Sequence, residues 1–204
     1  MVTVAGRRPG RPAGGKLVVD RESLLDAAER AIRRDGPMVS LETIALEAGV
    51  TKPVIYARIG DRTELSNALS ARLADRIVQS VFSAIAGQPI GRSALVLFLA
   101  ANLETAAGNR ELFFYVTGGS ADDSPQRSLL LASNSVTPLA AQLSQWRTDT
   151  GHDPAVAEAW SYALIGMLQL TTLWWLNQSA LTARDLAEQL AELLWGGLRT
   201  PPIA

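Results

Sequence analysis

The sequence predicts an all-α protein in two parts, a small three-helix unit near the N-terminus and a larger helical bundle after it. Residues that cap helices, followed at helix-length intervals by Gly or Pro residues that end them, recur from Asp20 onward. The alternation of apolar and polar residues that marks strands is scarce. The chain has 204 residues, of which 48% are hydrophobic, so it can bury a sizeable core.

Residues 1–19 precede the first helix and are rich in Gly, Pro and Arg, so we expect a flexible arm. The arm contains four cations and no acidic residue, although the net charge of the chain is -1. Its cations are candidates for binding nucleic acid. They are Arg7, Arg8, Arg11 and Lys16.

Two helices are expected after the arm. Asp20 can cap the first, in which Leu25, Ala28 and Ile32 share one face until Gly36-Pro37 ends it. Ser40 can cap the second, which is short and closes at Gly49.

Thr51 can cap a third helix, which ends at Gly60. Lys52 and Pro53 fall in its first turn, where the missing N–H of proline costs nothing. This helix is too short to bury much surface, so we expect it to exist for the side chains that it presents.

Asp61 can cap a longer fourth helix that runs from Arg62 into the eighties and links the small unit to the bundle. Leu65, Leu69 and Leu73 begin its continuous apolar stripe. Further helices are predicted over residues 92–107, 110–117, 125–147, 154–177 and 182–196.

The second and third helices, joined by the tight turn at Gly49, form a predicted helix-turn-helix. In this motif the second helix enters the major groove of DNA with its N-terminal residues leading. Ile59 and either Val54 or Ile55 would face inward. The side chains left for DNA are Thr51, Lys52, Pro53, Tyr56 and Arg58.

This region resembles the TetR family of bacterial transcriptional regulators. The resemblance covers about residues 20 to 70, in the stretches SLLDAAERAIRRDG and VSLETIALEAGVTKPVIYARIGDRTEL. Its marks are the pair Ile44-Ala45, the turn Ala48-Gly49-Val50, Tyr56, and the entry into the fourth helix from Gly60 to Leu65.

The resemblance implies that Lys52 and Tyr56 contact DNA phosphates. It also implies that Arg62 takes the place of a lysine that contacts phosphate at the start of the fourth helix, and that Ser40 or Thr43 touches the DNA backbone. The alternative for each of these residues is a solvated surface side chain.

The arm carries a second resemblance, because Arg11 in Gly10-Arg11-Pro12 is similar to the core of an AT-hook. Arginines in such an extended segment can reach into a narrow minor groove. The alternative is a disordered tail that only keeps the protein in solution.

In the family, the C-terminal bundle holds a mostly apolar ligand pocket, and its last two long helices form a homodimer. By resemblance, the bundle of this chain binds a small apolar or aromatic effector, although any one of its aromatic residues is equally explained as core. The candidate ligand contacts are Phe98, Asn102, Phe113, Trp146, Tyr162 and Gln169. The candidate dimer contacts are Ala159, Ala163, Gly166, Leu186, Leu190 and Leu194.

Other functions find little support in the sequence. The absence of Cys and the single His152 argue against metal sites and catalytic triads, so we expect neither an enzyme nor a cofactor. Gly10 to Lys16 match part of a phosphate-binding loop, but Leu17 stands where Ser or Thr would hold magnesium. The uncharged residues 159–176 raise the possibility of a membrane span, yet polar residues interrupt them and flanking cations are missing.

We therefore predict a cytoplasmic, homodimeric DNA-binding regulator of the repressor type, which binds double-stranded operator DNA and a small-molecule effector and no membrane. The expected division is an arm at 1–19, a helix-turn-helix domain at 20–66 and a ligand-binding and dimerisation domain at 67–204. The alternative is an architectural DNA-binding protein whose bundle serves only to dimerise.

Overall fold

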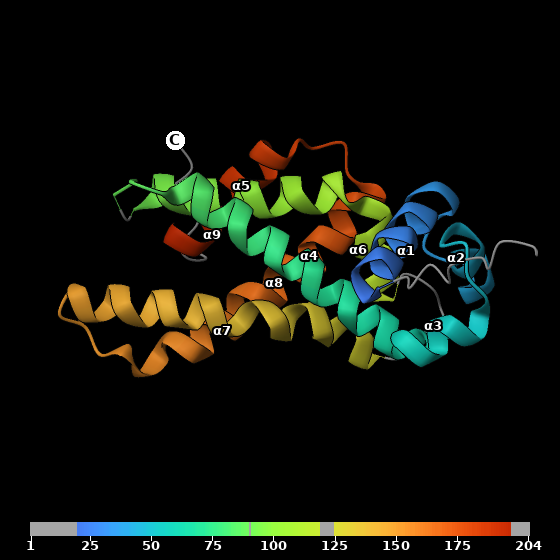
Figure 1. Ribbon diagram of the computed structural model, residues 1–204. Coiled ribbons are helices and arrows are strands. Elements are labelled where there is room, and N and C mark those ends of the chain that lie inside the picture. The colour runs from blue at the N-terminus through green and yellow to red at the C-terminus, as the bar shows by residue number, and fades with distance from the viewer. Residues whose placement is uncertain (1–19, 90, 119–124, 197–204) are drawn as a thin grey trace, which may run out of the picture.

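The computed structural model describes residues 20–89, 91–118 and 125–196. Apart from the single 3₁₀ turn Pro154–Val156, every regular element within these ranges is an α-helix, which confirms the all-α prediction. Three helices form a compact group at one end of the molecule, and a bundle of the other helices forms the rest (Figure 1).

The three helices of this group are α1 (Arg21–Asp35), α2 (Leu41–Glu47) and α3 (Lys52–Arg58). Two of the expected caps are confirmed. The Asp20 carboxylate accepts a hydrogen bond from the Ser23 N–H at 2.7 Å, and the Ser40 hydroxyl accepts one from the Thr43 N–H at 3.1 Å. Such caps satisfy N–H groups that have no partner within the helix.

The turn from α3 into α4 (Arg62–Ile85) requires a glycine. Gly60 has φ 114, and a Cβ on it would lie 1.4 Å from Oε2 of Glu64. That carboxylate accepts a hydrogen bond from the Asp61 N–H at 3.0 Å, while the Asp61 side chain accepts from the Glu64 N–H at 2.9 Å. This capping box fixes where α4 begins.

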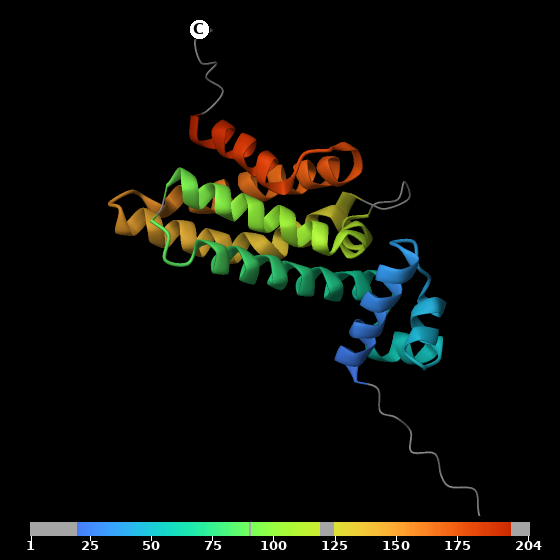
Figure 2. The same cartoon turned by 90° about the horizontal axis from the view of Figure 1, so that it is seen from above.

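The helix α4 connects the three-helix group to the bundle. This helix runs out of the three-helix group and along the bundle, and it packs against α5 and α7 (Figure 2). In turn α8 packs on α7, and α9 packs on α5. The remaining helices are α5 (Arg92–Gly108), α6 (Arg110–Thr117), α7 (Pro125–Asp149), α8 (Ala157–Gln178) and α9 (Ala183–Gly196).

Two apolar clusters form the core. One includes buried residues of α1 to α6 and therefore runs without interruption from the three-helix group into the bundle. The other joins α5, α8 and α9. Among the described residues no helix combines the length and the apolar character that a membrane crossing needs.

Candidate nucleic-acid interface and bundle cavity

The third helix is held by two isoleucines and presents the rest of its side chains. Ile55 is fully buried and Ile59 nearly so, whereas Lys52, Pro53 and Tyr56 are exposed. Lys52 and Tyr56 lie one helical turn apart, so they share one flank of α3. The exposed Arg58 is two residues beyond Tyr56 and lies on the other flank. The sequence therefore correctly predicted which side of this helix is buried.

The hydroxyl groups near α2 and α3 are in different situations. Thr51 occupies the N-cap position of α3, but its side chain makes no capping hydrogen bond, and the residue is exposed. The Ser40 hydroxyl is already a cap and lies 3.0 Å from the hydroxyl of the half-buried Thr43. Thr51 therefore has the more available hydroxyl.

Arg62 differs from the other predicted DNA contacts, because its guanidinium group lies against the protein. Its Nη1 donates to the Val39 carbonyl at 3.2 Å and its Nη2 to the Pro37 carbonyl at 3.4 Å. The guanidinium carbon also lies 5.2 Å from the ring centroid of Tyr115 in α6. The resemblance implied a phosphate contact for Arg62, with a solvated side chain as the alternative, and neither included these partners, which are distant in sequence.

The basic arm lies outside the described residues. The predictions for its four cations therefore remain predictions, and they concern Arg7, Arg8, Arg11 and Lys16.

Sequence reasoning missed an ion-pair network that joins α1 to α4. Arg72 pairs with Asp26 at 2.8 Å, and with Glu22 and Glu29. Arg76 pairs with Glu29 at 2.6 Å and donates to the side-chain oxygen of Asn109 at 3.3 Å. The signal was present, because acids four and three residues apart on α1 face arginines four residues apart on α4. This spacing can be recognised as an ion-pair pattern only once the two helices are known to be neighbours.

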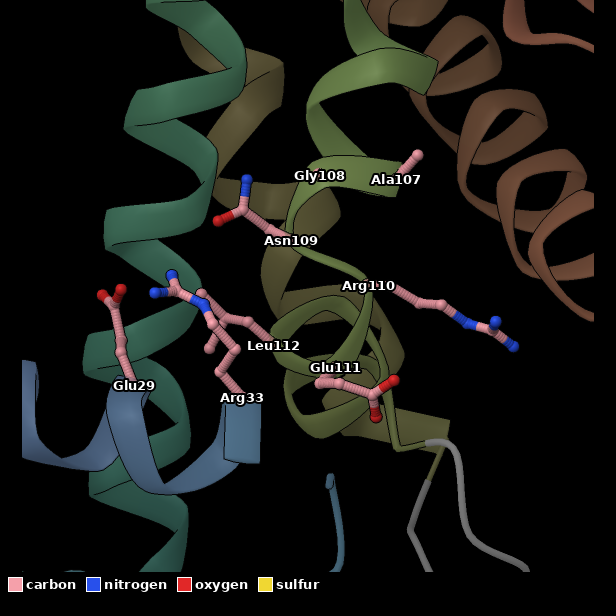
Figure 3. Close-up of a pocket in the computed structure, with 8 residues that line it drawn as sticks. All are labelled: Glu29, Arg33, Ala107, Gly108, Asn109, Arg110, Glu111 and Leu112. Carbon is pink, nitrogen blue, oxygen red and sulfur yellow. The ribbon is translucent and has the colours of Figure 1, made fainter. Parts of the chain in front are cut away.

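A cleft of about 170 Å³, lined by both charged and apolar groups, adjoins this network between α1 and the junction of α5 with α6. Figure 3 shows Glu29 and Arg33 projecting from α1 towards this junction, which supplies the rest of the lining. The lining residues of the junction are Ala107, Gly108, Asn109, Arg110, Glu111 and Leu112. Arg110 points away from Glu29 and Arg33, and its guanidinium lies 5.3 Å from the ring centroid of Phe114. The three-helix group and the first turn of α6 are therefore joined here by polar side chains around a gap.

The bundle contains a small cavity between α4, α5, α7 and α8, with a volume of about 20 Å³. That is room for about one water molecule. Phe98 and Asn102, both predicted ligand contacts, line it together. The other lining residues are Ile77, Val78, Val81, Phe82, Ser135, Leu139 and Ile165.

The other four predicted ligand contacts do not line this cavity. Phe113 is buried in the core cluster that reaches α1, and Tyr162 is 58% exposed on the outer side of α8. Trp146 and Gln169 are half-buried on α7 and α8. Aromatic character marked these positions, but it does not reveal which side of a helix faces the cavity.

The outward face of α8 is apolar. Ser161, Ile165, Leu168 and Thr172 turn inward, while the opposite side exposes Trp160, Leu170 and Trp174 beside the predicted contacts Ala159 and Ala163. Gly166 is half-buried, and nothing lies within 4 Å of the position that a Cβ would occupy there. This face extends along most of the helix.

The predicted face of α9 needs a correction. Leu186 and Leu190 are buried against α5 within the chain, so they do not form an outward surface. Leu194 is exposed, as predicted, and so are its neighbours Leu193 and Trp195. The apolar surface of α9 is therefore confined to its C-terminal end.

Comparisons with known proteins agree with this architecture. A family model described as "Tetracyclin repressor-like, C-terminal domain" matches residues 123–202. An uncharacterised HTH-type transcriptional regulator of Mycobacterium tuberculosis is 28% identical over 182 residues, which cover 87% of this chain and 76% of the relative. The HTH-type transcriptional activator FasR of Mycolicibacterium smegmatis is 24% identical over 212 residues, which cover 98% of this chain and 96% of FasR.

A solved structure has a similar fold. It is FadR of Thermus thermophilus, a TetR-family transcriptional repressor in complex with lauroyl-CoA. The match has a TM-score of 0.67 and 17% sequence identity, and it covers 90% of this chain and 98% of FadR. At this identity the likeness concerns the fold alone.

Proposed function

Because the chain belongs to the TetR family of bacterial transcriptional regulators, we propose that it is a homodimeric repressor that binds operator DNA through α3 and releases it when an effector enters the bundle. On this proposal residues 20–66 form the DNA-binding domain, and residues 67–204 form the ligand-binding and dimerisation domain. A protein whose target is chromosomal DNA belongs in the cytoplasm.

The observation that supports DNA binding most directly is the exposed face of α3. Lys52 and Tyr56 stand on one flank, where an ammonium and a phenol can donate to phosphates. Thr51 and Pro53 lie at the N-terminal end that leads into the major groove, where their apolar edges suit a thymine methyl group. Two copies of α3 in a dimer would contact half-sites in successive major grooves.

Dimerisation is supported by the outward face of α8. Exposed Trp160, Leu170 and Trp174 follow one another along this helix, with the small residues Ala159 and Ala163 beside them. Apolar surface of this extent is typical of a protein–protein interface. The exposed end of α9 adds Leu194 to the same proposed interface.

The effector is proposed to be an acyl compound, the chemistry bound by the similarly folded FadR. The bundle cavity suits the apolar part of such a ligand, and Asn102 offers a polar contact. However, about 20 Å³ cannot hold an acyl chain, so binding must separate the helices around the cavity.

That separation provides the mechanism. Ile77 and Val81 line the cavity from α4, and the same helix begins at the capping box beside α3. A ligand that favours the expanded bundle therefore also favours a different placement of the two α3 helices. If the ligand binds the expanded bundle more tightly than the bundle of the DNA-bound protein, operator affinity falls by the ratio of these two ligand affinities.

DNA binding is tested by fluorescence anisotropy on the DNA upstream of the gene for this protein, with a random duplex of equal length as the reference and a salt titration. A regulator binds the upstream DNA in clear preference to the random duplex. Equal binding to both duplexes would favour an architectural protein, and binding to neither would overturn the proposal. Weaker binding of the variants Lys52→Ala and Tyr56→Ala would identify the exposed face of α3 as the surface that contacts DNA.

Effector binding is tested separately, by titrating lauroyl-CoA and then lauric acid into the preformed complex with operator DNA. The expected result is release of DNA by at least one of the two acyl compounds. Asn102→Leu should shift the concentration that releases half of the DNA without changing operator affinity in the absence of ligand. Retention of DNA at saturating concentrations of both compounds would overturn the acyl assignment and leave DNA binding intact.

A further inference from the structure

We propose that Arg62 is a positioning residue, which fixes the helix-turn-helix against α6 from inside the protein and makes no contact with DNA phosphate. The inference rests on the proposed DNA-binding function. It differs from what the resemblance to the family implies for this position, a phosphate contact at the start of the fourth helix.

The first step is the geometry of the guanidinium group. In its plane, Nη1 and Nη2 donate to the carbonyls of Val39 and Pro37, at 3.2 and 3.4 Å. Its central carbon lies over the ring of Tyr115, 5.2 Å from the centroid. An arginine can use its planar donors and its face at the same time, and a lysine cannot. Arg62 thus joins three segments of the chain at one point.

The second step concerns what the two carbonyls control. Pro37 and Val39 belong to the connection between α1 and α2, and Val39 immediately precedes Ser40, the N-cap of α2. Arg62 itself is the first residue of α4, directly after the capping residue Asp61. It therefore ties the start of α4 to the start of the helix-turn-helix, which fixes the direction in which α3 projects.

The third step concerns α6. Tyr115 is 3% exposed, and the residues from Leu112 to Thr117 are buried as a group, so α6 is a core element, and it packs on α4 and α7. At its other end, Asn109 is joined through Arg76 to Glu29 of α1. This second bridge borders the cleft of about 170 Å³ in Figure 3. Arg62 and Tyr115 form the other bridge between α6 and the three-helix group.

These contacts account for the half-buried state of Arg62. Two of its donor nitrogens are already bonded, and the side chain is covered by its own protein. The group keeps three further N–H donors, but turning it out towards a phosphate would separate it from these two carbonyls and from the ring of Tyr115. A displacement of α6, by contrast, would pass directly through Tyr115 and Arg62 to the start of α2.

The test uses the salt dependence of DNA binding, because it separates phosphate contacts from positioning. Each lost phosphate contact lowers the slope of log affinity against log salt concentration by about one. We expect Arg62→Ala to bind operator DNA about tenfold more weakly, with unchanged salt slope and unchanged binding to random duplex. Arg62→Lys, which keeps the charge but not the planar donors, should show the same loss. Lys52→Ala is the matched control, and it should lower both affinities and the slope.

A double-mutant cycle tests the link to α6. Tyr115→Leu, which removes the ring, should reproduce the loss seen in Arg62→Lys, and the double variant should be no weaker than either single one. Tyr115→Phe retains the ring and should keep most of the operator preference. Thermal unfolding followed by circular dichroism confirms that each variant is folded at the assay temperature.

Two results would overturn the inference while leaving the proposed function standing. One is a parallel loss of operator and random-duplex affinity in Arg62→Lys and Arg62→Ala, with a lower salt slope in the alanine variant. The other is strict additivity of Arg62→Lys and Tyr115→Leu. Failure of the unsubstituted protein to bind either duplex would instead overturn the proposed function itself.

Discussion

The three-helix group and the bundle are stabilised by different kinds of interaction. In the first, helices begin at side-chain caps such as Asp20 and Ser40, and charged residues clamp neighbouring helices. In the second, the helices α5 and α8 are largely apolar and surround a cavity large enough for about one water. On the proposed function, the first part contacts DNA and the packing of the second changes when the effector binds.

This difference predicts where single substitutions act. A change in the three-helix group should affect its own folding or its own DNA contacts. A change on the bundle should act through assembly or through the placement of α4. Each of the following experiments tests one side of this comparison.

The largest effect is expected at the outer face of α8. Trp174 is 48% exposed, and Trp174→Glu would place a charge in the proposed dimer interface. We expect a dimer to become a monomer in multi-angle light scattering and operator affinity to fall on the order of 100-fold, because a single half-site is then bound. The melting temperature should change little.

The matched control for this experiment is Gln79→Glu, which adds the same charge at an exposed position of α4. The control should remain dimeric and retain operator affinity. A dimeric Trp174→Glu variant would contradict the assignment of the interface to α8.

The next effect concerns the turn that joins the two parts. Gly60→Ala places a methyl group 1.4 Å from Oε2 of Glu64 and forces a side chain onto φ 114. We expect a loss of about 2 kcal/mol in the free energy of unfolding, from backbone strain and the broken capping box. Urea denaturation followed by circular dichroism measures it.

Gly87→Ala separates the two causes. Gly87 has φ 71, but a Cβ there would meet nothing within 4 Å. This variant should lose only the strain contribution, about 1 kcal/mol. Equal losses in the two variants would show that Glu64 and its capping hydrogen bonds contribute nothing.

The comparison also explains what the sequence could predict. Roles set within about four residues along the chain were predictable: the caps Asp20, Ser40 and Asp61, the buried Ile55 and Ile59, and the bounds of most helices. Each of these depends on the local hydrogen-bond pattern or on helical periodicity.

Roles set by contacts between distant segments were not predictable. An arginine at the start of a helix is usually a surface cation, and only the proximity of Val39 and Tyr115 turns Arg62 inward. Leu186 and Leu190 look like any apolar face, and the packing of α9 on α5 decides that they are buried. Helical periodicity identifies the apolar face of a helix but does not show which element packs against it.

A smaller effect is expected for the DNA contacts of α3, where the two flanks can be compared. Lys52→Ala should weaken binding to operator and random duplex about fivefold and reduce the salt slope, as for a phosphate contact. The same affinities and salt slope are measured under identical conditions for Arg58→Ala, on the opposite flank of α3. If Arg58→Ala alone changes the salt slope, the helix enters the groove on the other flank.

The smallest effect concerns pH and the clamp between α1 and α2. Hydrogen bonds from Arg34, at 2.5 Å, and Arg30, at 3.0 Å, lower the pKa of the Glu47 carboxyl below its ordinary value of 4.5. Because the folded-state pKa is the lower one, the stability from this charge is fully present above pH 4.5 and is lost as the pH falls through the folded-state pKa. Glu47→Gln should therefore unfold at a lower urea concentration than the unsubstituted protein at pH 7, and this gap should narrow towards pH 3. Glu42→Gln, at an exposed position of the same helix, should show a smaller gap that varies less with pH. A gap for Glu47→Gln that stays constant from pH 7 to pH 3 would mean that the packing of this side chain, and not its charge, holds the two helices together.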